Sequence, residues 1–275
     1  MARSVEYITS RQNALVKLTA SLVDRKFREK EGLFRFDGKK LFLEALAADV
    51  PLFAVLLREN VADAMLSAAG EALPEACRCV TLPEELFDRI SEEKSPEGVI
   101  CIAKRLEQFH KIVEMNESAA FEQALLPGHT LLLESVRDPG NLGTVIRSAA
   151  AFGVSQVVLS ADCADLYHPR TLRAAMGTLF HTRVLIPSDF TEAVRRLGQR
   201  GRVFAAALDS NARALGQFEL AENDAVIVGN EGHGISAAVL AAATDTVYIP
   251  MAPGVESLNA GVAASVLLWE FYRGR

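Results

Sequence analysis

Six short and almost continuously apolar runs constrain the second half of this chain more than any other feature. They cover residues 131–133, 156–159, 184–186, 203–207, 225–228 and 246–249, and segments of helical periodicity separate them. Strands that are apolar on both faces are typical of a parallel sheet with helices on both sides, because a sheet with one wet face alternates polar and apolar residues. The pattern predicts an α/β domain with a parallel sheet over residues 129–275.

A smaller α/β unit is predicted ahead of it, over residues 1–106, and 275 residues suit two domains. Its expected strands are 33–36, 52–57, 79–81 and 99–103, and its expected helices are 13–29, 39–48, 61–69 and 83–90. Residues 107–128 are mixed in character and end in Leu-Leu-Pro-Gly. We expect them to form a linker or a connecting helix.

Composition excludes several classes of protein. Half of the residues are apolar and 23% are charged, as in a globular protein with a real core. The four cysteines form no C-x-x-C pair and no zinc-type spacing with histidine, so neither a disulfide scaffold nor a metal site is expected. The N-terminus lacks an apolar signal core, and no 18 apolar residues run together. We therefore expect a cytoplasmic protein without a membrane segment.

A basic run stands out inside this acidic chain of net charge −6. Residues 11–40 hold nine Lys or Arg against four acids. A solvated, salt-bridged helix face is the plain interpretation. The crowding of cations between residues 25 and 40 favours the alternative, because a phosphate backbone rewards it. The candidate nucleic-acid contacts are Arg25, Lys26, Arg28, Lys30 and Lys39.

Three loops follow predicted strands of the larger sheet, at the edge where ligands bind in such folds. The first contains an Asp138-Pro-Gly turn and then Asn141, which is placed to cap the next helix. Arg147 follows six residues later, less than two turns on, so both side chains can reach the same side of the sheet end. The alternative interpretation is that Asn141 is an ordinary N-cap and Arg147 is an ordinary surface cation.

The second and third loops are rich in Gly, Pro, Asn and Ser. Residues 229–234 have the order G-x-x-G-x-G, which is neither the dinucleotide fingerprint nor a Walker loop. Their glycines allow backbone N–H groups to approach a ligand, and Glu231 favours a cationic or neutral one. In the third loop two prolines and a glycine fix the path, Ser257 could cap the last helix, and Asn259 lies in its first turn.

These loops resemble, in order and separation, the three motifs of the SpoU (TrmH-type) RNA 2′-O-ribose methyltransferases over roughly residues 129–273. The matching segments are Glu134…Asp138-Pro-Gly-Asn141-Leu-Gly-x-x-x-Arg147, Val228-Gly-Asn-Glu231-Gly-x-Gly234 and Ile249-Pro-Met251…Glu256-Ser-Leu-Asn259. His168-Pro-Arg-x-x-Arg-x-x-x-Gly177 resembles the family's linking segment. Residues 8–104 are more weakly similar to its substrate-binding domain of ribosomal-protein-like α/β fold, with Ala14 and Asp37 where the family often has Pro and Glu.

The resemblance implies a sheet threaded into a deep trefoil knot, a rare topology. It implies binding of S-adenosylmethionine and methylation of a ribose 2′-hydroxyl in RNA, with ribosomal RNA expected before transfer RNA. The implied reaction-site residues are Asn141, Arg147, Glu231, Ser257 and Asn259. The implied cofactor residues are Gly229, Asn230, Ile249, Met251 and Leu258. A transfer-RNA methyltransferase, a non-catalytic RNA-binding scaffold and a nucleotide-dependent α/β enzyme are the alternatives.

The chemistry suits these residue types. A guanidinium does not readily lose its proton, so Arg147 is a poor base. We expect it to hold a phosphate and the 2′-oxygen and to stabilise developing alkoxide charge, while a phosphate oxygen or water takes the proton. Asn141, Ser257 and Asn259 would orient the ribose, and Glu231 could tether Arg147 or favour the sulfonium.

The last predicted helix, from residue 257 to about 272, is apolar around most of its circumference. Its large apolar side chains include Val262, Val266, Leu267, Trp269 and Phe271. Such a helix must be buried in the core or against a partner. Family members are typically dimers whose site is completed across the interface, so we expect a homodimer.

Overall fold

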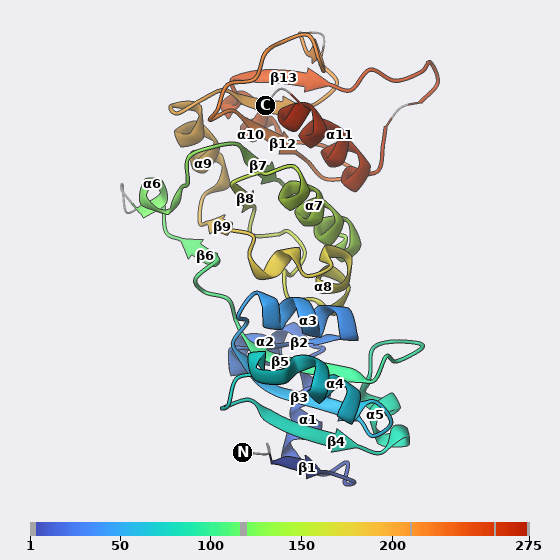
Figure 1. Cartoon of the computed structure of the whole chain (residues 1–275). Helices are drawn as coiled ribbons and strands as arrows, with labels where there is room; N and C mark the ends of the chain where they lie inside the picture. Colours follow the sequence, from blue (N-terminus) through green and yellow to red (C-terminus); the bar gives the residue numbers. More distant parts are fainter. Residues whose placement is uncertain (1–3, 116–119, 210, 256, 274–275) are drawn as a thin grey trace. The chain divides into compact units, whose positions relative to one another are not determined.

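The computed structural model describes residues 4–115, 120–209, 211–255 and 257–273 (Figure 1). The chain divides into two compact units. The first unit combines Met1–Leu106 with Tyr167–Phe180. The second combines Glu107–Leu166 with His181–Arg275.

The first unit is built on a five-stranded sheet in the order β1-β4-β3-β5-β2. Its strands are β1 (Val5–Tyr7), β2 (Leu33–Asp37), β3 (Leu52–Arg58), β4 (Arg78–Leu82) and β5 (Val99–Lys104). β5 pairs antiparallel with β2 and β3, and the other pairs are parallel. Its helices are α1 (Ala14–Ser21), α2 (Arg25–Glu31), α3 (Lys39–Ala47), α4 (Ala62–Ala69), η1 (Gly70–Ala72) and α5 (Glu84–Ile90). An α/β unit is confirmed here; β1 has no predicted counterpart.

The helix predicted over residues 13–29 is interrupted. Asn13 caps α1 by accepting a hydrogen bond from the backbone N–H of Leu15 at 2.8 Å. Arg28 of α2 donates to the carbonyl oxygens of Leu22 (2.8 Å) and Val23, which lie between α1 and α2. The last carbonyls of a helix lack partners within it, so the buried guanidinium stabilises this break.

A segment predicted to belong to the second domain is part of the first unit. It contains α8 (Pro169–Ala175) and η2 (Thr178–Phe180). The ring of Tyr167 lies 4.5 Å from that of Phe34, and the ring of Phe180 lies 5.1 Å from that of Phe36. Aromatic contacts with β2 therefore hold the segment, and local periodicity carries no sign of such contacts.

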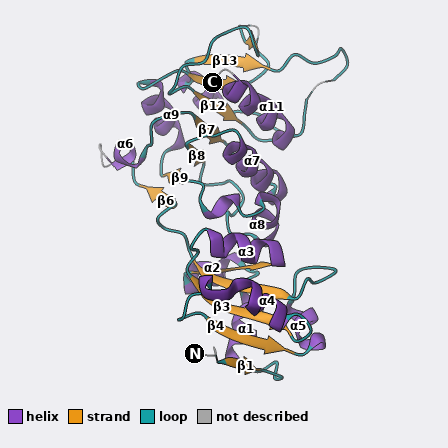
Figure 2. Cartoon of the chain, viewed as in Figure 1, coloured by secondary structure: helices purple, strands orange, loops and turns teal. Residues whose placement is uncertain are grey.

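The second unit is an eight-stranded, wholly parallel sheet in the order β11-β13-β10-β12-β7-β8-β9-β6. Figure 2 shows β12, β7, β8, β9 and β6 following one another in this order. Its strands are β6 (His110–Val113), β7 (Thr130–Leu133), β8 (Gln156–Leu159), β9 (Val184–Pro187), β10 (Val203–Ala206), β11 (Arg213–Ala214), β12 (Ala225–Val228) and β13 (Asp245–Tyr248). The predicted parallel sheet and its six strands are confirmed. Residues 107–128 are more than a linker, since β6 pairs with β9 and extends the sheet.

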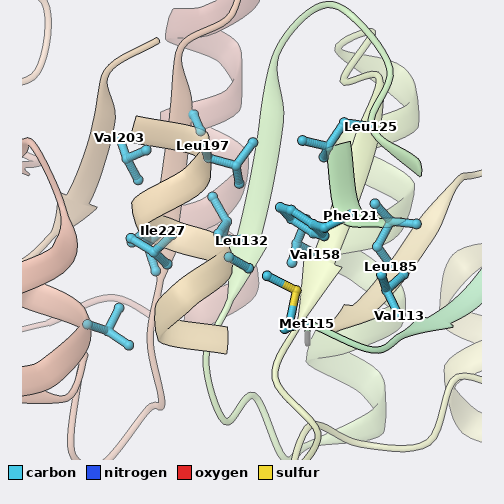
Figure 3. Close-up of a cluster of buried hydrophobic side chains, with 14 of the residues drawn as sticks. Val113, Met115, Phe121, Leu125, Leu132, Val158, Leu185, Leu197, Val203 and Ile227 are labelled. Atoms are coloured by element: carbon cyan, nitrogen blue, oxygen red, sulfur yellow. The ribbon is translucent and has the colours of Figure 1, made fainter. Parts of the chain in front are cut away.

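Helices pack on this sheet, and a compact apolar core fixes one face. The helices are α6 (Ala120–Ala124), α7 (Pro139–Ala151), α9 (Phe190–Gly198), α10 (Ala237–Ala242) and α11 (Ala260–Arg273). Leu132, Val158, Leu185 and Ile227 are fully buried and lie in one apolar cluster with side chains of α6, α9 and α10 (Figure 3). α7 and α11 pack against each other. The core holds β7 beside β12, so the loops that follow these strands start side by side.

Candidate active site at the carboxyl ends of the parallel strands

The first loop leads into α7 through a well-formed cap. Asp138, not Asn141, is the N-cap, and its side chain accepts from the backbone N–H of Asn141 at 2.8 Å. Pro139 occupies the first turn, where a missing N–H costs no hydrogen bond. The prediction that Asn141 caps the helix is therefore wrong. Its side-chain amide stays available for contacts with other loops.

A chain of hydrogen bonds joins all three loops. The Nδ2 of Asn141 donates to Oε1 of Glu231 at 2.7 Å. The Nδ2 of Asn259 donates to Oδ1 of Asn141 at 3.0 Å. Asn259 in turn accepts from the backbone N–H groups of Gly261 (2.9 Å) and Val262 (3.3 Å). Asn259, not Ser257 as predicted, thus caps α11.

This chain has a fixed direction. Because the amides of α11 occupy Oδ1 of Asn259, only its NH₂ can face Asn141. Asn141 must then turn its own NH₂ toward Glu231, whose carboxylate oxygen is the acceptor. The helix N-terminus therefore orients three polar side chains from three separate loops.

The 229–234 loop is shaped by its own residues. Asn230 and Gly234 exchange backbone hydrogen bonds of 3.0 and 2.9 Å. The side chain of Asn230 accepts from Gly232 (2.8 Å) and His233 (3.2 Å). A Cβ on Gly229 would lie 2.4 Å from the carbonyl carbon of Gly234. Glycine at 229 is thus required by the close approach of the loop's two ends.

A cavity of about 400 Å³ lies beside these loops. All five predicted cofactor residues line it, together with Glu231 and Ser257. They are Gly229, Asn230, Ile249, Met251 and Leu258. Apolar side chains such as Val228, Ile235 and Leu267 supply most of the remaining wall. This volume and lining are typical of a site for a small organic ligand, and the carboxylate suits a ligand with a positive charge.

Arg147 lies apart from this cluster. It is exposed on α7 and is not among the residues that line the cavity. Within the described part of the chain it makes no hydrogen bond or ion pair. The idea that Glu231 tethers Arg147 is wrong in this structure, since Glu231 accepts from Asn141 instead. Glu256 of the third motif lies outside the described residues.

The fold exposes some of the predicted nucleic-acid contacts and buries others. Arg25 and Lys26 are exposed, and Arg25 pairs with Glu29 at 2.7 Å. Lys30 is also exposed and lies 3.4 Å from Glu31. Arg28 is only 3% exposed and is committed to backbone carbonyls, so its prediction as a nucleic-acid contact is wrong.

Two further residues of the basic run have hydrogen-bond partners within the first unit. The backbone N–H of Lys39 donates to Oε2 of Glu97 at 2.7 Å, and this lysine is half-buried. Arg35 is fully buried and pairs with Asp37 at 2.7 Å. It also donates to the carbonyl oxygens of Thr19 and Ile90. A buried charge needs such partners, so Arg35 is a core residue of the first unit.

A polar network behind the first loop was missed by sequence reasoning. Asp162, in the loop after β8, accepts from Ser135 Oγ (2.6 Å), Ser160 Oγ (2.7 Å) and Arg137 (3.1 Å). Burial by itself would raise the pKa of Asp162, but these hydrogen bonds lower this pKa to about 2. Asp162 belongs to none of the three motifs, and no sequence signal distinguishes it from other surface acids.

Comparison with known proteins decides the family. The sequence model of the SpoU rRNA Methylase family matches residues 128–269, which contain all three loops. The chain belongs to the SpoU rRNA methylase family. A second model, the MRM3-like substrate binding domain, matches residues 13–101. The resemblance of both parts is therefore confirmed.

Relatives match over nearly the full length of this SpoU-family chain. It is 31% identical over 266 residues to the 23S rRNA (guanosine(2553)-2′-O)-methyltransferase RlmP of Bacillus subtilis, covering 96% of this chain and 98% of that protein. A TrmH-family protein from Porphyromonas gingivalis matches with a TM-score of 0.80 and 30% identity, over 96% of this chain and 99% of that one. A solved RNA 2′-O ribose methyltransferase matches with a TM-score of 0.79 and 30% identity, over 98% of each chain.

Two further properties of the described residues bear on the other predictions. No described helix is both long and apolar enough to cross a bilayer. The same residues contain no group of three or more His, Cys, Asp or Glu side chains arranged to hold a metal ion. That the protein uses no metal stays a prediction.

Proposed function

We propose that this chain is an S-adenosylmethionine-dependent methyltransferase that acts on a ribose 2′-hydroxyl of ribosomal RNA. One observation carries the proposal. The hydrogen-bonded chain from Asn259 through Asn141 to Glu231 unites three loops beside the 400 Å³ cavity. The RNA 2′-O-methyltransferases among its relatives, including one named for 23S rRNA, support this activity and substrate class.

The cavity fits the proposed cofactor. Apolar walls and loop backbone suit a nucleoside and a thioether chain, and Glu231 places a carboxylate at the lining. When bound, S-adenosylmethionine supplies an electrophilic methyl group on a sulfonium. Gly229, Asn230, Ile249, Met251 and Leu258 would hold it. A carboxylate at the lining also argues against a nucleotide polyphosphate in the same place.

The residues of the chain divide the remaining work. A ribose 2′-hydroxyl is a poor nucleophile that must lose a proton and be held in line. Asn141, Asn259 and the nearby Ser257 orient the ribose through hydrogen bonds. Arg147, whose guanidinium has no partner among the described residues, binds the adjacent phosphate and the 2′-oxygen and stabilises developing negative charge. A phosphate oxygen or water accepts the proton.

A methyl-transfer assay tests the proposal. The full chain is mixed with S-adenosylmethionine labelled in its methyl group and with ribosomal RNA from a strain lacking the gene. Label should appear in alkali-resistant dinucleotides, because a 2′-O-methyl group blocks alkaline cleavage of the RNA. Label in alkali-sensitive nucleotides, or transfer to transfer RNA alone, would contradict the proposed reaction or substrate. Absence of S-adenosylmethionine binding by calorimetry would favour the non-catalytic scaffold.

The hydrogen-bonded chain has its own test in this assay. Asn141→Ala removes the link between Glu231 and Asn259, and we expect methyl transfer to fall about 10- to 100-fold because the ribose is no longer oriented. Asn223→Ala is the matched control, since Asn223 accepts one hydrogen bond from Gly128 away from the cavity. It should retain transfer within about twofold. Equal losses in the two variants would assign both effects to the fold.

We propose that the first unit binds the RNA. Support comes from the match of residues 13–101 to a substrate-binding domain and from the exposed cations of α2. The residues that remain in this proposal are Arg25, Lys26, Lys30 and Lys39, without the buried Arg28. RNA binding that is unchanged after removal of these charges would contradict it.

We also propose a homodimer formed through α11. One side of this helix lies in the core, with Leu267 and Leu268 at most 1% exposed. The opposite side exposes Val262, Val266 and Trp269 in a stripe at one-turn spacing, 37–50% exposed. Ser148, next in sequence to Arg147, contacts Ser265 of α11 at 2.7 Å. Arg147 and the stripe therefore lie on adjoining helices, which supports a site completed by the second copy.

The oligomeric state is measured by light scattering. The wild-type chain should give roughly 60 kDa, twice its 29.8 kDa. Val266→Glu should shift it toward the monomer, because a charge at the centre of an apolar interface is costly to bury. A monomer at micromolar concentration in the wild type would contradict the dimer.

Two finer features stay proposals. We propose the knotted threading of the sheet, and the non-sequential strand order with β12 between β7 and β10 supports it. An experimental structure traced through residues 225–273 tests the threading. The cytoplasmic location stays a prediction, which fractionation of cells would check.

A further inference from the structure

The turn after β7 contains an unusual backbone conformation. Ser135 has φ of +55°, in the left-handed region that residues with a side chain rarely adopt. It lies between β7 and the Asp138 cap of α7, where the first of the three loops begins. Such conformations persist only where surrounding contacts determine them, and they cluster at functional sites.

Every polar group of Ser135 has a partner. Its backbone N–H donates to Oγ of Ser160 at 2.8 Å, and its hydroxyl donates to Oδ2 of Asp162 at 2.6 Å. Its carbonyl oxygen accepts from Nδ2 of Asn230 at 2.7 Å. Asp162 also accepts from the hydroxyl of Ser160 at 2.7 Å. The Asp162 carboxylate therefore binds the Ser135 hydroxyl directly and the Ser135 backbone N–H through Ser160. Arg137 lies 3.1 Å from the same carboxylate.

The third of these hydrogen bonds leads directly to the cofactor loop. Asn230 lines the cavity and uses its other side-chain atom, Oδ1, to accept from the backbone of Gly232 and His233. The position of its Nδ2 is set by the carbonyl of Ser135. A change in the conformation of Ser135 would therefore release one of the two ends by which Asn230 is held.

We propose that Asp162 is a positioning residue of the cofactor site, which acts by holding Ser135 in its left-handed conformation and, through it, the Asn230 side chain and the 229–234 loop. Asp162 lies outside the three motifs and does not line the cavity. The inference rests on the proposed use of that cavity for S-adenosylmethionine. It adds a residue that reaches the ligand only through two others.

Comparing Asp162→Ala in the wild-type chain and in a Ser135→Gly chain separates this role from a general loss of stability. Asp162→Ala should raise the Kd for S-adenosylmethionine about tenfold, measured by titration calorimetry on the full chain. Glycine adopts positive φ without support. In a Ser135→Gly background the same Asp162→Ala change should therefore alter the Kd by less than about twofold. Asp162→Asn keeps an acceptor oxygen and should lie between wild type and Asp162→Ala.

The cofactor-free protein gives an independent measurement. Asp162→Ala should accelerate hydrogen exchange at the amides of Gly232 and His233 at least about fivefold, because Asn230 no longer holds them firmly, and the Ser135→Gly background should reduce this effect. Asp189→Ala is the matched control, since Asp189 accepts from Glu192 to cap α9 and does not line the cavity. It should change neither the Kd nor exchange in the loop.

The outcomes are distinct. A tenfold loss of affinity in both backgrounds would show that Asp162 does not act through Ser135. An unchanged Kd and unchanged exchange in Asp162→Ala would remove Asp162 from the site. If wild-type protein bound no S-adenosylmethionine, the proposed function would fail, while the exchange measurements would still decide whether Asp162 holds the loop.

Discussion

Arginines in the two units of this chain have opposite environments. Arg28 and Arg35 of the first unit are at most 3% exposed, and each donates to backbone carbonyls that would otherwise lack partners. Arg147 of the second unit is exposed and makes no hydrogen bond or ion pair with any described residue. A guanidinium that already has partners stabilises the fold, and one without them can bind a ligand anion.

The same comparison applies to acidic residues of the second unit. Glu231 lines the cavity and accepts from Asn141, so it is part of the loop cluster itself. Asp162 lies behind the cluster and accepts from three neighbours that shape the loop. Proximity to a motif in the sequence therefore does not separate ligand-facing groups from supporting ones. Their hydrogen-bond partners do.

The largest expected effect concerns Arg147. If it binds the RNA phosphate and the 2′-oxygen, Arg147→Ala should reduce methyl transfer on the order of a hundredfold or more, with less than about tenfold change in S-adenosylmethionine affinity. Arg147→Lys should stay poor, because lysine keeps the charge but loses the planar fork. Arg200→Ala, another exposed cation of the second unit, is the control. Near-normal turnover in Arg147→Ala would contradict the assignment of Arg147 to binding of the RNA phosphate.

Arg28 should behave in the opposite way. Arg28→Ala leaves the carbonyls of Leu22 and Val23 without their donor and should lower the free energy of unfolding by about 3 kcal/mol. Arg25→Ala breaks an exposed pair with Glu29 and should cost at most about 0.5 kcal/mol. Urea titration followed by circular dichroism measures both. A small loss in Arg28→Ala would return that residue to the set of candidate RNA contacts.

The exposed cations of α2 should affect RNA affinity and little else. Lys26→Gln with Lys30→Gln should weaken RNA binding about five- to tenfold. The slope of log K against log salt should become shallower by about 1 for each lysine that no longer neutralises a phosphate. Affinity for S-adenosylmethionine should not change. Lys111→Gln on β6 is the control for net charge. An unaltered slope would leave these lysines as solvated surface residues.

The smallest expected effect is a pH dependence from Asp162. Its pKa falls from 3.8 to about 2 on folding, so its stabilising contribution is complete above about pH 5 and is lost as the pH falls through about 2. Since the side chain is 46% exposed, we expect less than about 1 kcal/mol. The stability difference between wild type and Asp162→Asn should therefore shrink from pH 7 to about pH 2.5. A constant difference would mean that the charge of Asp162 does not contribute.

Much of the larger unit was predictable from short-range patterns. Its six apolar strands were located within one or two residues, and the three loops after them form one cluster, as the carboxyl-end rule for parallel sheets predicts. The edge strands β6 and β11 were missed. β6 exposes Ile112 and pairs on one side only, so it lacks the continuous apolar run that marked the inner strands.

The caps show where local reasoning fails. Both Asn141 and Asp138 are good cap residues, and both Ser257 and Asn259 could precede α11. Which one caps depends on where the chain first becomes helical, and that is set by packing of the helix on the sheet. The structure chooses Asp138 and Asn259, and this choice turns the amide of Asn141 toward Glu231.

The sequence by itself determined the family, the parallel sheet and the three loops, because apolar periodicity and motif spacing are local properties. Only the tertiary structure decided which charged residues face solvent, which unit the Tyr167–Phe180 segment joins, and which side chains support Ser135. These depend on contacts between residues far apart in the chain, such as Asn230 with Ser135 or Tyr167 with Phe34. The free energy of a buried polar group depends on the group to which it is hydrogen-bonded. The local sequence does not reveal which group that is.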